Sequence, residues 1–222
     1  MAEAPGPGAP AGAAPPLARR LHSITGVVPV GVFLVFHLLT NATARQGADA
    51  YNAMSRKLQS LPLVILAEIL VIAAPLFFHG IYGLFRIATD VTADPARPGR
   101  RFLAAAQARS ALTFAQQLTG VALFAFVLFH LWTARLVQIH DHESLDLFRL
   151  MQAALANPWI RAAYAIGIVS AAFHLAAGLW TFADTWGFMS TRRVRRLAGF
   201  ASAAVFLGLA VLGLSTLSAF RL

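Results

Sequence analysis

Four Phe-His dipeptides stand in the first four apolar stretches of the chain, and they supply His37, His79, His130 and His174. An imidazole buried in hydrocarbon without a partner is costly, so ionisable residues are rare at membrane depth. A single histidine there can be a polar residue bonded to a neighbouring helix. Imidazole is also a common metal ligand, and two rings from different helices can bind one haem iron. Four such residues therefore predict two bis-histidine haems, an arrangement suited to electron transfer.

The composition indicates a polytopic membrane protein. Of the 222 residues, 58% are hydrophobic and 12% charged, and the mean hydropathy is +0.66, too apolar for a soluble domain. The apolar runs are each close to the ~20 residues that cross ~30 Å of hydrocarbon; they cover 24–42, 62–87, 111–137, 159–183 and 197–219. We expect an all-α protein of five transmembrane helices, the first four bundled around two stacked b haems. Residues 1–18 read as a disordered tail before a single membrane domain, 19–222.

Charge and cysteine usage narrow the classes of function. The formal charge of +9 is better explained by loop arginines that fix topology than by nucleic-acid binding. The chain has no cysteine, so it offers no thiolate ligands for an iron–sulfur cluster. Any such cluster is expected on a partner.

The distribution of basic residues predicts the orientation. Arg19 and Arg20 together with the 86–109 and 192–196 connections supply eleven arginines, against seven basic residues on the other side. The positive-inside rule then places the N-terminus in the cytoplasm and the C-terminus outside, across a bacterial cytoplasmic membrane. With about 1.5 Å of rise per residue, His37 and His130 form an outer pair, and His79 and His174 an inner pair.

An internal repeat supports this pairing. Spans 2 and 4 share F-H-x-x-x-G-L, which places Gly83 and Gly178 one turn after their histidines. Spans 1 and 3 share Thr-Gly-Val followed by F-H-L. A glycine on the histidine face admits a flat macrocycle or a closely packed helix.

Other polar residues near the spans are weaker candidates. Glu68 lies in span 2, about 16 Å nearer the outer face than His79 if the helix is regular, and is a candidate for quinone-linked proton transfer. Arg19, Arg20, His22 and Ser23 form a group suited to haem propionates or partner docking, although His22 is equally compatible with an interfacial anchor. His140 and His142 belong to an acidic outer loop and are expected to be solvated. Four tryptophans fall near span ends, where interfacial aromatics are common, and carry no predicted chemistry.

The chain resembles the cytochrome b membrane-anchor subunits of succinate:quinone oxidoreductases (succinate dehydrogenase and fumarate reductase), in the five-helix dihaem (cytochrome b558) branch. The resemblance runs from about Arg19 to the C-terminal end. It rests on R-R-L-H-S-I-T-G-V (19–27), V-F-H-L-L-T-N (35–41), F-F-H-G-I-Y-G (77–83), L-F-H-L-W-T-A-R (128–135) and F-H-L-A-A-G-L-W-T-F-A-D-T-W-G (173–187).

The resemblance implies that the four histidines are axial haem ligands, paired as above. It also implies a flavoprotein carrying FAD, an iron–sulfur subunit on the cytoplasmic face, menaquinone as the membrane substrate, and association into dimers or trimers of the whole complex. The fumarate-reductase side of the branch carries a glutamate two residues before the span 4 histidine, where this chain has Ala172. That departure favours succinate oxidation over the fumarate-reductase direction.

Three alternatives remain open at this stage. A quinol–cytochrome c type cytochrome b carries its ligands on two helices, whereas here they are spread over four. A haem-bearing anchor of a hydrogenase or formate dehydrogenase would differ in its partner and not in its spectrum. A transporter with a histidine proton relay would bind no haem.

Overall fold

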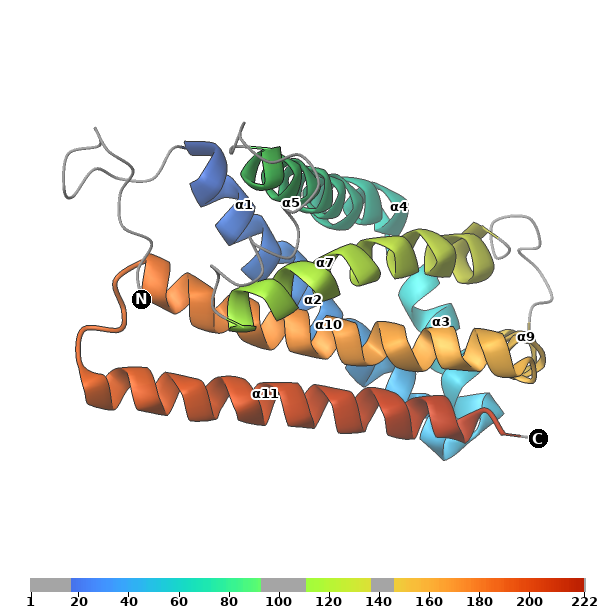
Figure 1. The fold of residues 1–222 in the computed structure, drawn as a ribbon. Coiled ribbons are helices and arrows are strands. Elements are labelled where there is room, and N and C mark those ends of the chain that lie inside the picture. The colour runs from blue at the N-terminus through green and yellow to red at the C-terminus, as the bar shows by residue number, and fades with distance from the viewer. Residues whose placement is uncertain (1–16, 93–110, 137–145, 222) are drawn as a thin grey trace.

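The protein is described here by a computed structural model that covers residues 17–92, 111–136 and 146–221. All elements in these ranges are helical (Figure 1). In chain order they are α1 (Leu17–Val27), α2 (Pro29–Asn41), η1 (Ala42–Gln46), α3 (Ala48–Gln59), α4 (Val64–Ala67), η2 (Glu68–Ala73), α5 (Ala74–Thr92), α7 (Ala111–His130), η3 (Leu131–Leu136), α9 (Leu147–Leu155), α10 (Pro158–Thr185) and α11 (Arg192–Ala219).

Five of the helical stretches are long and apolar enough to cross a membrane, as the sequence predicts. They are Leu17–Gln46, Val64–Thr89, Ala111–Ala134, Pro158–Thr185 and Arg192–Ala219. The first begins at Leu17, so the last two residues of the expected tail belong to a helix, while residues 1–16 lie outside the described part. His140 and His142 also lie outside the described residues. The all-α, five-span fold is therefore confirmed.

Three local features interrupt the spans. Pro29 divides the first span because proline has no N–H to donate to the preceding turn, so α1 ends at Val27 and α2 begins after Val28. η2 and η3 are π-helical, and such segments widen a helix by one residue per turn. The direction of the Glu68 side chain and its axial distance from His79 therefore differ from those of a regular helix.

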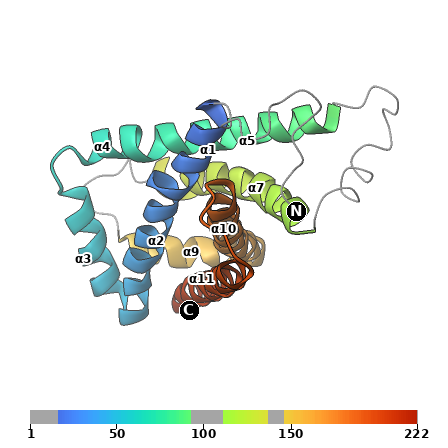
Figure 2. The same ribbon diagram turned by 90° about the vertical axis from the view of Figure 1, so that its left-hand side faces the viewer.

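Helix α10 forms the centre of the assembly. Figures 1 and 2 show α11 lying along α10, with α4 and α5 on the opposite side of α7 and α10. The central stretch of α10 is rich in alanine, which allows close approach, and Ala172 is fully buried in a cluster with Leu38 and Leu209. Asn157 caps the start of α10 by accepting the backbone N–H groups of Trp159 and Ile160.

Two short helices, α3 and α9, close the end of the bundle that also holds the end of α11. Both lie between the apolar runs of the sequence, so hydropathy does not predict them. Asn52 of α3 donates its amide to Asp146 (2.7 Å) and accepts the backbone N–H of Phe148 (3.1 Å). Asp146 also caps α9 by accepting the N–H of Arg149. These bonds join two connections that are distant in sequence.

We expect Asp146→Asn to lower the thermal stability of the purified chain at neutral pH. The hydrogen bond from Asn52, followed by the N–H of Arg149, lowers the pKa of Asp146 below its ordinary 3.8. A lowered pKa stabilises the fold above the unfolded value, and this contribution is lost as pH falls through the folded value. The difference in Tm between wild type and variant should therefore shrink below pH 3.8.

Arg149→Gln is the matched control, because it removes the exposed Asp146–Arg149 ion pair (3.4 Å) and keeps the backbone cap. Exposed pairs contribute little. A larger loss of Tm in Arg149→Gln than in Asp146→Asn would contradict the role given to Asn52.

Candidate functional site

The four histidines meet as two pairs inside the bundle. His37 of α2 lies beside His130 of α7, with ring centroids 5.8 Å apart. His79 of α5 lies beside His174 of α10, with centroids 6.1 Å apart. The histidines are adjacent in the combinations that the sequence predicts, and each pair joins two different spans. The names outer pair (His37 and His130) and inner pair (His79 and His174) are kept for them, after the orientation that the sequence predicts.

The spacing of both pairs suits two ligands of one metal. Metal–imidazole bonds are about 2 Å long, which places the ring centroids of two opposed ligands roughly 6 Å apart. The ring planes of each pair are nearly perpendicular, at 78° and 83°. No group of three or more His, Cys, Asp or Glu residues in the described ranges forms a protein-only metal site.

Backbone carbonyls fix the tautomers of the inner pair. His79 donates from Nδ1 to the carbonyl of His22 (2.9 Å), and His174 donates from Nδ1 to the carbonyl of Gln116 (3.0 Å). A carbonyl can only accept, so in neutral rings both protons are on Nδ1 and both Nε2 atoms keep their lone pairs. Metal-ligating histidines are normally held by such a bond from the other nitrogen.

Glycine explains how an imidazole can reach a carbonyl inside a regular helix. Gly26 and Gly120 each lie one turn after the accepting carbonyl. A Cβ at Gly26 would collide with the ring of His79, and one at Gly120 would lie 2.8 Å from Cε1 of His174. The preceding threonines donate to carbonyls of the same turns, Thr25 to Leu21 (2.8 Å) and Thr119 to Ala115 (2.7 Å). The glycine of each Thr-Gly-Val sequence therefore makes room for the imidazole of one inner-pair histidine.

His22 packs against the inner pair. Its ring stacks on His79, with centroids 4.1 Å apart and planes 9° apart. Its Nδ1 is the buried side-chain polar atom in the described ranges that has no hydrogen-bond partner. Gly83 leaves room for this ring, since a Cβ there would lie 3.3 Å from its Cε1. At Gly178 a Cβ would make only an ordinary contact with the amide of Gln116 (3.6 Å), so close approach accounts for Gly83 and not for Gly178.

Side chains, rather than backbone, surround the outer pair. Nδ1 of His130 lies 3.3 Å from the hydroxyl of Tyr164, which lies 3.0 Å from that of Thr133. The amide of Asn41 donates to the carbonyl of His37 (2.7 Å), with the ring nitrogens at 3.4 and 3.5 Å. Burial raises the pKa of Tyr51 to about 12, so its hydroxyl stays protonated and donates to Asn41 (3.2 Å).

The weaker candidates occupy different places. Glu68 is half-buried at the start of η2, which packs against α2, the helix of His37. The Arg20 guanidinium lies 5.1 Å from the ring of Trp186, and Ser23 accepts from the indole N–H of Trp186 (3.4 Å). Arg19 is exposed. The structure therefore places His22 with the inner pair and ties Arg20 and Ser23 to the end of α10.

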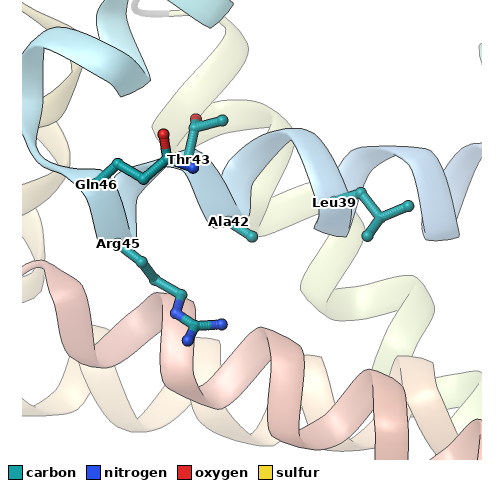
Figure 3. A pocket seen from close by; sticks show the side chains of 5 residues that line it. All are labelled: Leu39, Ala42, Thr43, Arg45 and Gln46. Carbon is teal, nitrogen blue, oxygen red and sulfur yellow. The ribbon is translucent and has the colours of Figure 1, made fainter.

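A surface hollow of about 370 Å³ lies away from the histidines. Figure 3 shows its lining, which comes from the end of α2 and from η1 and includes Arg45 and Thr43. None of the four paired histidines lines it, so it is not part of the site.

Several residues of the site were not identified from the sequence. Gly26 and Gly120 had a signal, since they stand in the noted Thr-Gly-Val repeat. Asn41 belongs to V-F-H-L-L-T-N, but its contact depends on an adjacent helix. Tyr164 is a single aromatic residue in a span, where packing is the ordinary interpretation. Trp186 had been assigned to an interfacial belt alone.

Comparison with known proteins decides the family. Residues 18–115 and 95–213 match the family described as "Succinate dehydrogenase/Fumarate reductase transmembrane subunit". The chain belongs to this family. It is also 35% identical, over 203 residues, to the succinate dehydrogenase cytochrome b558 subunit of Bacillus subtilis (strain 168); the alignment covers 91% of this chain and 95% of the relative. This transmembrane subunit is thus the membrane anchor of a succinate:quinone oxidoreductase and part of an enzyme.

If the inner pair binds haem, Gly26→Ala should weaken haem retention, by roughly the 10- to 100-fold typical of losing a ligand's supporting bond. The added methyl group pushes His79 from its carbonyl. Gly120→Ala should act in the same direction but less, because its contact is looser. The b-type absorbance per purified complex measures the effect.

Gly199→Ala and Gly208→Ala are the matched controls, since a Cβ at either position of α11 meets open space. Equal haem content in all four variants would show that close approach at Gly26 and Gly120 does not matter.

Proposed function

We propose that this transmembrane subunit is a dihaem cytochrome b that passes electrons between an iron–sulfur partner and membrane menaquinone. The single observation that carries the proposal is the pairing of four histidines from four spans at a ring separation suited to one metal per pair. Family membership favours this interpretation over the hydrogenase, formate dehydrogenase, quinol–cytochrome c and transporter alternatives. The printed name of the relative, a cytochrome b558 subunit, supports haem b as the cofactor.

The residues present fit haem in each layer. His79 and His174 would hold the inner haem through Nε2, because their Nδ1 protons are engaged by carbonyls. His37 and His130 would hold the outer one. When bound, haem b supplies one-electron transfer through its iron. The unpaired Nδ1 of His22 and the nearby Arg20 and Ser23 are candidates to contact its propionates or the docked partner.

The partners follow from what the chain lacks. It has no cysteine for a cluster, and its family is described by succinate dehydrogenase and fumarate reductase, so we assign the cluster to an iron–sulfur subunit and the dicarboxylate chemistry to an FAD-bearing flavoprotein, both on the cytoplasmic face. The excess of arginine at Arg19 and Arg20 and in the 86–109 and 192–196 connections supports a cytoplasmic N-terminus, with the C-terminus outside. Dimers or trimers of the whole complex are part of the same proposal.

Succinate oxidation is the proposed direction. Ala172 stands where the fumarate-reductase side of the branch carries a glutamate, and it is fully buried among apolar side chains. A proton path through this position has no polar group to use. Electron transfer to menaquinone near the outer face could draw on the membrane potential, worth about 2.3 kcal/mol per charge for each 100 mV.

The two histidines of each pair should contribute to one and the same spectral component. His79→Ala and His174→Ala should both remove the inner component, and His37→Ala and His130→Ala the outer one, because a low-spin b haem needs both axial ligands. Low-temperature difference spectra of purified complexes resolve the two. Loss of one and the same component in all four variants would show the pairing to be wrong, and absence of any b-type spectrum in the parent protein would remove the haem assignment.

Glu68 is proposed to exchange protons with quinone near the outer haem. Glu68→Gln should then reduce succinate-driven menaquinone reduction by about 10²-fold or more, the usual contribution of a positioned acid or base. Both haems and electron transfer to an artificial acceptor at the flavoprotein should be preserved. Glu68→Asp, which keeps the carboxyl group, is the control; full quinone-linked turnover in Glu68→Gln would remove the hypothesis.

A further inference from the structure

The outer pair contains a hydrogen-bond chain that the proposed function does not use. It runs from His130 of α7 to Tyr164 of α10 and then to Thr133 of η3. Tyr164 is only 6% exposed, and its ring also packs against Phe126 and Phe129 at centroid distances of 5.3 and 6.0 Å. The hydroxyl is thus held in a fixed position beside the imidazole.

One direction makes all three contacts of this chain hydrogen bonds at the same time. In it, Thr133 donates its one hydroxyl hydrogen to the carbonyl of Phe129 (3.0 Å), which can only accept. The contact between Thr133 and Tyr164 (3.0 Å) then has Tyr164 as the donor. The hydroxyl hydrogen of Tyr164 is then used, so its oxygen accepts from Nδ1 of His130 (3.3 Å).

This direction has a chemical consequence for His130. With the proton on Nδ1, the neutral ring presents the lone pair of Nε2. The inner pair reaches the same tautomer through backbone carbonyls that no substitution can delete. At the outer pair the acceptor is a side chain that depends on a second side chain, so the support of His130 can be altered one group at a time.

We propose that Tyr164, oriented by Thr133, is a positioning residue that fixes the ligating tautomer of His130 and lowers the reduction potential of the outer haem. This inference rests on the proposed function. An acceptor on Nδ1–H makes an imidazole a more basic ligand, and a more basic axial ligand favours oxidised iron. Removing the acceptor raises the potential.

The test is a potentiometric titration of the purified complex, with the outer component defined as the one lost in His130→Ala. Tyr164→Phe keeps the ring and deletes the acceptor. We expect the outer potential to rise by roughly a tenfold change in the reduction equilibrium, about 59 mV for one electron, with the inner potential unchanged. Low-temperature electron paramagnetic resonance of the oxidised outer haem should change with it.

Three further variants make the result specific. Thr133→Val should shift the outer potential in the same direction, and Thr133→Ser, which keeps the hydroxyl, should restore it. Tyr82→Phe removes a tyrosine hydroxyl near His22, where ring centroids are 5.2 Å apart, and should leave the outer component untouched. If Tyr164→Phe loses the outer haem altogether, the inference is tested by comparing the outer potentials of Thr133→Val and Thr133→Ser.

The possible failures are distinct. An unchanged outer potential and resonance signal in Tyr164→Phe and Thr133→Val, with the component still lost in His130→Ala, overturns this inference and leaves the proposed function standing. Retention of both components in His130→Ala overturns the ligand assignment itself, and this inference with it.

Discussion

A buried imidazole must donate its N–H, and the packing of the site follows from that requirement. In hydrocarbon an unpaired donor is expensive, so His79 and His174 each reach a backbone carbonyl on a neighbouring helix. The two imidazoles reach these carbonyls because the residue one turn later has no side chain, which explains Gly26 and Gly120. The bond brings the helices together and leaves Nε2 available, so one interaction would serve both packing and the proposed ligation.

The two layers meet this requirement in different ways. The inner pair uses main-chain acceptors, related by the internal repeat, and tolerates little change because a methyl group at Gly26 collides with the ligand. The outer pair uses Tyr164 for His130 and has Asn41 beside His37. Side-chain acceptors differ in strength and can be replaced in evolution without moving a helix. The outer layer is therefore where the electronic properties of a ligand can be adjusted with least effect on the fold.

Much of the fold follows from hydropathy and spacing. Apolar runs of membrane-spanning length predict the five spans, and the recurrence of Phe-His in four of them predicts which spans carry ligands. The boundary between α1 and α2 at Pro29 is equally local, since it follows from a missing N–H. By contrast, α3 and α9 are held by Asn52 and Asp146, whose contact crosses a long stretch of sequence. The π-helical turn at Glu68 also depends on packing, and it changes the face and depth that a regular helix assigns to this residue.

The sequence by itself determined the class of protein, the spans and the four histidines, because each depends on residue type and on distance along a single helix. Only the tertiary structure decided what surrounds them. The alignment of His22 on His79, the acceptor role of Tyr164 and the purpose of the Thr-Gly-Val glycines arise where one helix meets another. Those contacts depend on the rotation and separation of helices, which no local pattern specifies.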